Sequence, residues 1–505
     1  RLTGPASGVS TAGELTMSGV WVHGAEGHGI EQTSGGSVSL DHVLVSSTGR
    51  AEDDLADGAI ETGNGLTIGA HPVECRVHGS TFEQNTSYSI LVSTWRGALD
   101  VQDVLIRNTP ADEHWETGRG LGLLGGSATA RRLVADRCHG MCLSAHGGSR
   151  LELEDVVVRR NRASGANEWA AAVTAVLSDL VLRRGLFEDN EESAIYLVGN
   201  WSIPPPTIED VVIRRTVPGQ RFHLGNGVEA ESSPFTMSRA LFEQCHSDGI
   251  TLAVGPESGV QYSIPVQLSD IVILESPSRT EGEQGAGILV VGRYDVEGHR
   301  ISISGASGVG VWADGEGADL ELADLSIVAT EPDRDDFFGM AAVVVDGAHL
   351  TASRALIDRA SGAGLFANGD GSTVRLSDLT VREVGPGQAE VFGFDYLDKH
   401  GGYGIAAIDG ADLEVDRGVI EGASIAGIHL SGAGTTGRLE DVRIAGTELG
   451  VVEGAESVGG LVAERSASVA VARAVVTDTI LRGLLARGEG TVLSLEDVAV
   501  RATRP

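Results

Sequence analysis

Apolar and polar positions alternate in short runs along the whole chain, and one run recurs many times. Its form is apolar-x-apolar-x-Asp-apolar-x-apolar, as in Leu151-Glu-Leu-Glu-Asp155-Val-Val-Val. Alternation with a period of two on both sides of the acid predicts two short strands with one inward face, bent at the aspartate. Further copies are centred on Asp103, Asp210, Asp270, Asp324, Asp378, Asp441 and Asp497, and an early copy has His42 at that place.

A second run lies between these copies and carries arginine where the first carries aspartate. Its arginines are Arg132, Arg184, Arg239, Arg300, Arg354, Arg417 and Arg473. If successive copies stack as adjacent parallel strands, about 4.8 Å apart, opposite charges would pair and like charges would repel. We therefore predict an Asp/Arg ladder along one corner of a solenoid, with a structural role in fixing the register of the coils.

A small polar position follows each corner by a few residues, and a Gly-apolar-x-apolar step follows that. The steps include Gly249-Ile-Thr-Leu, Gly364-Leu-Phe-Ala and Gly427-Ile-His-Leu, and each predicts the start of a third strand. Stacked asparagines at a turn would satisfy backbone groups and tolerate a left-handed φ. The small polar positions are Asn85, Asn108, Cys138, Asn161, Asn190, Thr216, Cys245 and Ser276.

These repeats cover essentially the whole chain, and they resemble the right-handed parallel β-helix repeat superfamily, which includes the pectate-lyase-like proteins. The resemblance implies an all-β chain, one right-handed parallel β-helix of about 18 coils arranged as two-coil repeats. We expect a single domain over residues 1–505. Solenoids need polar caps, and neither end of the sequence shows one, so we also expect flanking domains or a partner at the ends. The resemblance says little about activity, because this fold carries lyases, hydrolases, epimerases, adhesins and phage spikes.

Composition narrows the class of partner. The chain has 70 glycines, 14 prolines and 4% aromatic residues, which suits many short strands joined by tight turns. Its formal net charge of −34 would repel phosphate backbones, so we expect no nucleic-acid partner. We expect no membrane span, because no run of about 18 apolar residues occurs. An extracellular or cell-surface location fits. We expect no cofactor, and Ca²⁺ is the one candidate that such acidity leaves open.

Longer insertions occur where the Asp-type copies end, so they should leave the solenoid on one side, where repeat proteins commonly bind partners. These insertions are residues 46–64, 108–119, 216–227, 275–286, 329–339, 383–402 and 446–459. We expect any functional site to lie along that side.

The 383–402 insertion concentrates the residue types that could act in catalysis. Its candidate catalytic residues are Asp395, Asp398, Lys399 and His400, since carboxylates beside Lys or His suit acid/base work at a sugar carbon. Phe392-Gly-Phe-Asp395 resembles in part the Tyr-Gly-Phe-Asp-Pro-His stretch of mannuronan C5-epimerases. Phe392 lacks the hydroxyl and Tyr396-Leu397 replaces Pro-His, which leaves an epimerase role in doubt. A loop that folds its own aromatics onto the coils is the preferred interpretation.

Aromatic and acidic residues in the other insertions are candidates for carbohydrate binding, because tryptophan can stack on sugars through its apolar faces. The candidate binding residues are Trp115, Trp169, Asp335, Asp336 and Tyr396. Trp95 and Trp201 occur at a second pair of matching turns and could equally shield the coil edges.

Two further motifs are weak. Gly27-His28-Gly29 resembles the Gly-His-Gly of polygalacturonase-type hydrolases, but the companion motifs of that family do not occur. Cys138-His139-Gly-Met-Cys142 with His146 could be a metal cluster, yet the spacing differs from common zinc sites. A local disulfide or two buried thiols is favoured there, and no metal site is predicted.

Two functions remain open. The favoured one is a secreted or cell-surface β-helix that acts as a structural, adhesive or binding scaffold without catalytic activity. A polysaccharide or another surface component would be its partner. The alternative is a polysaccharide-active enzyme, a uronate lyase or C5-epimerase, centred on the 383–402 insertion.

Overall fold

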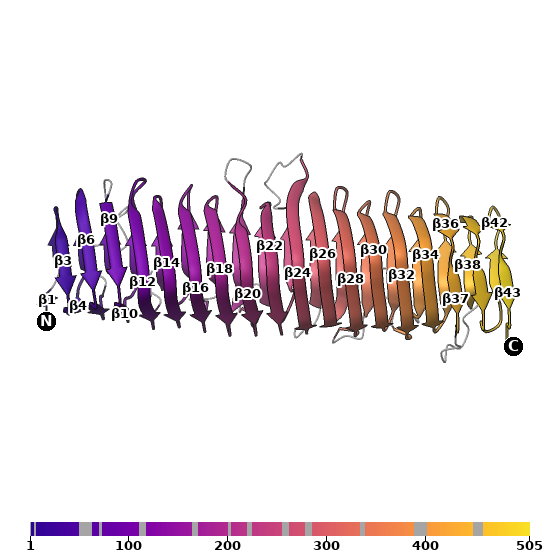
Figure 1. Ribbon diagram of the computed structural model, residues 1–505, viewed down its shortest axis with the longest axis horizontal. Helices are drawn as coiled ribbons and strands as arrows, with labels where there is room; N and C mark the ends of the chain where they lie inside the picture. Colours follow the sequence, from indigo (N-terminus) through magenta and orange to yellow (C-terminus); the bar gives the residue numbers. More distant parts are fainter. Residues whose placement is uncertain are drawn as a thin grey trace. The chain divides into compact units, whose positions relative to one another are not determined.

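A computed structural model of the chain describes residues 2–4, 7–49, 63–69, 73–110, 118–163, 170–199, 204–219, 225–254, 262–277, 285–333, 339–387, 401–447 and 458–504. The regular secondary structure of these residues is β-strand (Figure 1). Within them, no helix is long and apolar enough to cross a membrane.

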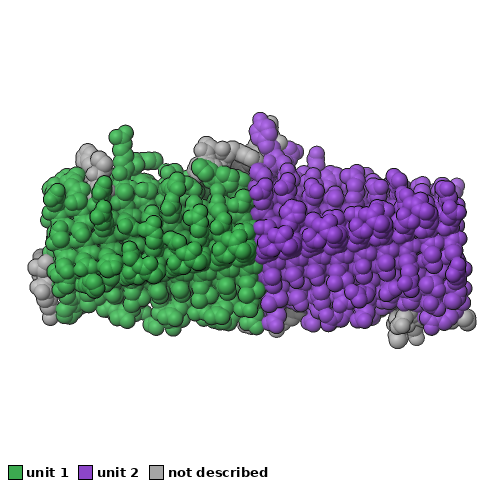
Figure 2. Space-filling model, in the orientation of Figure 1, with its two compact units in different colours: residues 1–245 green, residues 246–505 purple. Residues whose placement is uncertain are grey.

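The chain divides into two compact units, residues 1–245 and 246–505 (Figure 2). Both units have the same architecture. In each coil the chain runs along one sheet that is bent at a corner, here called the bent sheet, and returns along a second sheet, here called the closing sheet. The prediction of a single domain over residues 1–505 stays a prediction.

In unit 1 the bent sheet comprises β1 (Leu2–Gly4), β3 (Leu15–Ser18), β4 (Trp21–Ala25), β6 (Gly36–Asp41), β7 (Leu44–Ser46), β9 (Val73–His78), β10 (Thr81–Glu83), β12 (Ala98–Arg107), β14 (Ser127–Asp136), β16 (Arg150–Arg159), β18 (Asp179–Glu188), β20 (Thr207–Arg214) and β22 (Phe235–Glu243). The closing sheet comprises β2 (Ser7–Thr11), β5 (His28–Gln32), β8 (Asn64–Ile68), β11 (Tyr88–Val92), β13 (Arg119–Leu123), β15 (Met141–His146), β17 (Ala171–Val176), β19 (Glu192–Val198) and β21 (Gly225–Glu231).

In unit 2 the bent sheet comprises β24 (Ile264–Ser276), β26 (Tyr294–Ala306), β28 (Asp319–Thr330), β30 (His349–Ala360), β32 (Thr373–Val384), β34 (Asp412–Ala423), β36 (Thr436–Glu440), β37 (Arg443–Ala445), β39 (Ser468–Ala472), β40 (Val475–Thr477), β42 (Val492–Glu496) and β43 (Ala499–Arg501). The closing sheet comprises β23 (Ile250–Ala253), β25 (Gly285–Val291), β27 (Gly308–Asp314), β29 (Met340–Val345), β31 (Ala363–Asn368), β33 (Tyr403–Ile408), β35 (Ala426–Ser431), β38 (Gly459–Glu464) and β41 (Leu484–Arg487).

Strands of successive coils pair in parallel within each unit. β14, for example, lies between β12 and β16 with Ala128 opposite both Leu99 and Leu151. Each described closing sheet contributes nine strands, which gives 18 coils over the two units. The predicted all-β right-handed parallel β-helix of about 18 coils is confirmed.

The acidic and basic corner residues bend the strands as predicted. Asp155 has φ 54° and Arg184 has φ 54°, in the left-handed region. One left-handed residue shifts the alternation by one position, so Leu153 before the corner and Val156 after it are both buried. The corner therefore lets both arms of the strand face the same core.

Consecutive corners form the predicted ion pairs, but as separate Asp–Arg pairs and not as a continuous ladder of bonds. Each arginine bonds the aspartate of the preceding coil through Nε and Nη2, at 2.5–3.1 Å, as Arg132 bonds Asp103 and Arg354 bonds Asp324. The register also sets Arg354 beside Asp378 of the next coil, but Asp378 accepts its two bonds from Arg417. The Nε–Nη2 edge of each guanidinium is committed to one corner carboxylate, and the next corner aspartate is bonded by the same edge of its own arginine.

The small polar positions are correct except at one coil. Thr109 is the fully buried residue of that row. Asn108 lies one position earlier, at a second corner where the bent strand ends, with φ 52°. The left-handed φ also belongs to the residue before each buried one, as at Arg160 before Asn161. Asn161 instead uses its Nδ2 to donate to the carbonyls of Gly140 at 2.6 Å and Ala171 at 3.1 Å. Its role is to satisfy backbone groups inside the core.

The glycine steps begin the closing strands as predicted, for a steric reason. A Cβ added at Gly364 would lie 2.5 Å from the carbonyl oxygen of Gly404 and 2.8 Å from Val381, both in the next coil. The closing sheet can approach the bent sheet only without a side chain there.

The predicted insertions all connect a bent strand to the closing strand of the same coil. The 108–119 insertion leads from β12 to β13, and the 383–402 insertion leads from β32 to β33. Within each unit they therefore leave the coils at one edge of the closing sheet.

Candidate functional site

The candidate residues on the insertions lie outside the described residues. Asp395, Tyr396, Asp398, Lys399 and His400 fall in 388–400, and the remaining candidates, Trp115, Trp169, Asp335 and Asp336, fall in 111–117, 164–169 and 334–338. Their roles stay predictions. Each of these segments leads into a strand of a closing sheet.

Apolar side chains gather on the outer face of the closing sheet in unit 2, where they form a buried cluster. Leu430 of β35 faces the interior, because a Cβ added at the inward position Gly437 would lie 2.5 Å from its Cδ2. Strand alternation then turns His429 outward. The residues in register with it form what we call the outer row: Trp312, Val343, Phe366, Ala406, His429 and Val462.

His429 is the polar member of the outer row, and its surroundings are closed. Its ring stacks on Tyr403 with centroids 5.1 Å apart, and its Nε2 lies 3.3 Å from Glu464 Oε1. Glu464 accepts a bond from Arg487 Nη2 at 2.7 Å. The side chains of His429 and Glu464 are 1% and 2% exposed. A histidine beside a carboxylate could act as a general base, but both side chains of this pair are almost completely buried.

The sequence already contained a signal for this pair. Gly427-Ile-His-Leu predicted a third strand, and alternation within that strand places His429 on its outer face. The partner Glu464 could not be found the same way, because its coil is separated by an insertion of different length.

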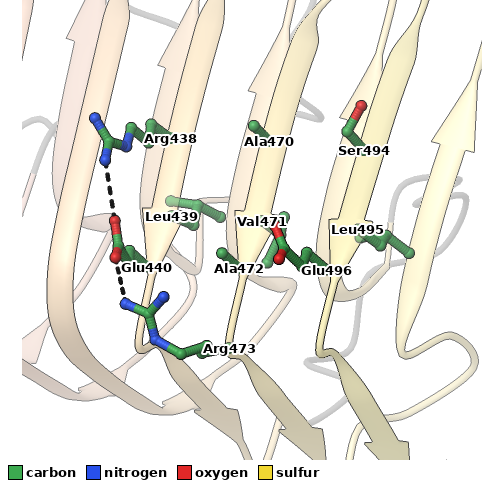
Figure 3. Close-up of a pocket in the computed structure, with 10 residues that line it drawn as sticks. All are labelled: Arg438, Leu439, Glu440, Ala470, Val471, Ala472, Arg473, Ser494, Leu495 and Glu496. Carbon is green, nitrogen blue, oxygen red and sulfur yellow. Dashed lines mark hydrogen bonds and ion pairs between the residues drawn. The ribbon is translucent and has the colours of Figure 1, made fainter.

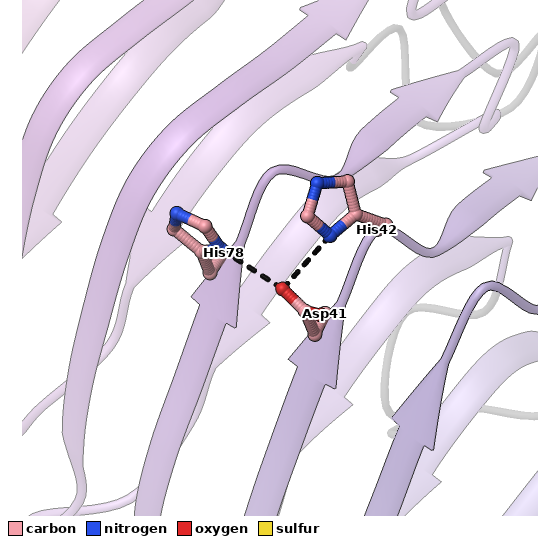
Figure 4. A group of neighbouring side chains, drawn as sticks. All are labelled: Asp41, His42 and His78. Carbon is pink, nitrogen blue, oxygen red and sulfur yellow. Dashed lines mark hydrogen bonds and ion pairs between the residues drawn. The ribbon is translucent and has the colours of Figure 1, made fainter.

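A second group of side chains lies at the first corner of unit 1 (Figure 4). Asp41 ends β6, His42 is the corner residue with φ 52°, and His78 ends β9 in direct register with Asp41. Nδ1 of His42 and Nδ1 of His78 each lie 2.9 Å from Asp41 Oδ1. All three side chains are about half exposed or more, at 46–66%.

Neighbouring groups orient this cluster. Ser18 Oγ donates to Asp41 Oδ2 at 3.3 Å, and His78 Nε2 lies 3.4 Å from Asp103 Oδ2. The bonds from His78 and His42 lower the pKa of Asp41, and the bond to Asp41 raises the pKa of His78. Within the described residues, this is the one group of three or more potential metal ligands whose donor atoms all lie within 4.8 Å of one another.

The cysteine motif forms no such group. Cys138 and Cys142 are free, buried thiols, and burial raises the pKa of Cys142. Of the two alternatives from the sequence, the structure selects buried thiols over a disulfide. Thiols in this form are inert towards metals and electrophiles.

A hollow near the C-terminal end of unit 2 is lined by charged residues that neutralise one another (Figure 3). Glu440 bonds Arg438 at 3.1 Å and also contacts Arg473, and these arginines lower its pKa. The same hollow exposes Leu495, at 49%. Its arginines are therefore already committed to carboxylates of this chain.

No protein-family model and no curated protein sequence matches the chain. Among solved structures, the chain is similar to the A-module of the mannuronan C-5 epimerase AlgE4 of Azotobacter vinelandii, with 11% identity over 88% of this chain and 89% of that one, and a TM-score of 0.24. It is also similar to the PL6 family alginate lyase AlyGC, with 10% identity over 98% of this chain and 97% of that one, and a TM-score of 0.25. Similarity at this level says nothing about the activity of this chain.

Proposed function

We propose that the chain is a non-catalytic scaffold, secreted or displayed at a cell surface, that presents its insertions to a partner. The observation that carries the proposal is the state of its arginines. At the described corners each arginine forms an ion pair with one aspartate of the same chain, as Arg239 does with Asp210 and Arg300 with Asp270.

Charge argues against the enzymatic alternative. Alginate and pectate carry a carboxylate on nearly every sugar, so a protein that processes them needs cations in its groove. This chain has a formal net charge of −34. Arginines beyond the first corners are also paired, as Arg160 is to Asp136 at 2.6 Å and Arg215 to Asp189 at 2.7 Å. A polyuronate would meet net repulsion from a chain of this charge.

A neutral polysaccharide fits the chain better as a partner. Tryptophan stacks on sugar rings without any charge, and Trp115 and Trp169 belong to segments that enter the closing sheet of unit 1. No cofactor is needed for such binding.

The enzymatic alternative is tested with alginate and pectate, with and without Ca²⁺. Ultraviolet absorbance of unsaturated uronates reports lyase activity, and the proton NMR spectrum of the polymer reports epimerisation. We expect neither product. Turnover that disappears in Asp395→Ala or Lys399→Ala would establish the lyase or epimerase instead.

Binding is tested by affinity electrophoresis in gels that contain neutral polysaccharides or alginate. We expect retardation by a neutral polymer that weakens in Trp115→Ala and Trp169→Ala. Trp95→Ala is the matched control, because Trp95 is 79% exposed but lies at the turn between β11 and β12, away from the insertions. Equal retardation of all three variants and the parent chain would contradict carbohydrate binding by these residues.

A further inference from the structure

The first coils of unit 1 depart from the rule that governs later corners. From Asp103 onward in this unit, each aspartate at a corner is bonded by the arginine of the next coil, as Asp103 is by Arg132 and Asp155 by Arg184. Before Asp103 the corner residues are Gly19, His42 and Gly79, so none of these corners carries an arginine. Two imidazoles and one carboxylate gather there instead.

Gly79 affects this corner through space rather than through its backbone conformation. Its φ is +56°, which Asp103 and Arg132 adopt at the same place in later coils with full side chains. A Cβ at position 79 would lie 3.1 Å from Nε2 of His42 and 3.2 Å from its Cδ2 and Cε1. The absent side chain therefore leaves the room in which the His42 ring lies.

The donor atoms already converge on one point. Both Nδ1 atoms approach Asp41 Oδ1 at 2.9 Å. In a tetrahedral zinc site, with metal–ligand distances of about 2.0–2.2 Å, neighbouring donors are roughly 3.3 Å apart. The two Nδ1–Oδ1 distances are a few tenths of an ångström shorter than that, and the donor atoms of all three residues lie within 4.8 Å of one another, so rotations of these exposed side chains would bring them to the spacing of a metal site.

Asp103 adds the support that metal-binding histidines usually have. A histidine that binds a metal through one nitrogen commonly donates from the other to a carboxylate, which fixes its tautomer and orientation. His78 would bind through Nδ1, and its Nε2 lies 3.4 Å from Asp103 Oδ2. Asp103 is itself held by Arg132 at 2.5 Å and 2.8 Å.

We propose that Asp41, His42 and His78 bind a divalent transition-metal ion of the zinc class, with water in the remaining position. Imidazole selects such ions over Ca²⁺, which requires oxygen ligands. The ion would join β6 to β9 across two consecutive coils, as the Asp–Arg pairs do farther along the unit. This site is independent of the proposed scaffold function.

The test is a titration of the whole chain, produced without a histidine tag and freed of metal, with zinc chloride in a calorimeter. Cobalt(II) provides a second readout, because its visible absorption reports the coordination of the ion. We expect one site per chain that is tighter than any other, and visible cobalt bands. His42→Gln and His78→Gln should each weaken that site tenfold or more, and the double variant should remove it.

Asp41→Asn is a second ligand variant that keeps both imidazoles, and it should also weaken the site. His299→Gln is the matched control: His299 precedes corner Arg300 in unit 2 as His78 precedes corner Gly79, and its register neighbours are Ser269 and Ala323. Far-ultraviolet circular dichroism checks that each variant is folded. The proposal is overturned if the parent chain takes up no zinc, or if its tightest site survives the double histidine variant.

Discussion

From Asp103 onward, each residue at an Asp/Arg corner combines a left-handed backbone with a charged side chain. Arginine has no special preference for positive φ, unlike Asp or Asn. It is nevertheless found there with φ 51° at Arg132 and φ 52° at Arg354. The bidentate bond to the aspartate one coil earlier explains its presence, because that geometry is set only when the Arg backbone turns at the same point as the Asp backbone.

Asn161 offers a residue-scale test of the buried row. Asn161→Ala would leave the carbonyls of Gly140 and Ala171 without the bonds that its Nδ2 donates. We expect a loss of about 1–3 kcal/mol in the free energy of unfolding, since two buried carbonyls would each lose a hydrogen bond and Gly140 would keep only the one from the Ala171 N–H. Urea unfolding followed by circular dichroism measures it. Ser238→Ala, on the outer face of β22, is the control and should change stability by less than about 0.5 kcal/mol.

At the residue scale, the sequence predicted the corner positions and the ion pairs between successive corners, but it missed two contacts that depend on exact register. The corners and their pairs could be predicted because acids and arginines alternate strictly from one copy to the next. The exchange of Asn108 for Thr109 and the grouping of Asp41, His42 and His78 depend on register between coils. That register is set by strand pairing across insertions whose lengths differ, so it cannot be deduced from the sequence pattern.

At the scale of elements, each corner arginine bonds the aspartate of the preceding coil and not that of the next coil. A bent strand therefore interacts differently with its two neighbours. Arg354 bonds Asp324 behind it, and Asp378 ahead of it is bonded by Arg417. Asp324→Arg would set three arginines on consecutive rungs, at positions 300, 324 and 354. We expect a fall of a few degrees in the thermal midpoint, because the charges repel and the pair is lost.

The charge swap Asp324→Arg with Arg354→Asp separates pairing from general charge. It restores the pair between these two coils, but it places the introduced arginine beside Arg300 and the introduced aspartate beside Asp378, so recovery should be partial. Differential scanning calorimetry of the two single variants and the double variant measures the coupling. Strictly additive effects would show that these corners do not interact.

At the scale of strands, the prediction from sequence was nearly complete. Period-two alternation on both sides of a corner specified the bent sheet, and the glycine steps specified the closing sheet. What the pattern could not provide was the burial of the outer row of unit 2. Alternation within the predicted strands turns Phe366 and Ala406 outward, as it does His429, but it does not reveal that these outward side chains are fully buried.

The charge of the whole molecule predicts a stability that first rises and then falls on acidification. Burial and neighbouring carboxylates raise the pKa of Asp295 and Asp314 above their ordinary value of 3.8. Their charged forms are disfavoured in the fold, so this penalty is present at neutral pH and is relieved as the pH falls through their raised pKa.

The corner aspartates act in the opposite sense. Hydrogen bonds from Arg354 and Arg417 lower the pKa of Asp324 and Asp378 below 3.8. Their contribution is fully present above pH 3.8 and is lost as the pH falls through their lowered pKa. We expect the urea midpoint to peak in mild acid. Asp295→Asn should flatten the rise and leave the fall, and a midpoint that declines steadily from neutral pH would contradict the assignment.

Backward pairing of each arginine also constrains how such a chain can change its length. A deletion of one coil would bring two acids or two arginines face to face, while a deletion of two coils keeps every partner matched. We therefore expect the fold to tolerate the duplication or loss of two coils better than that of one coil. Engineered versions of the chain should be lengthened by whole pairs, such as the segment from Asp324 to the residue before Asp378.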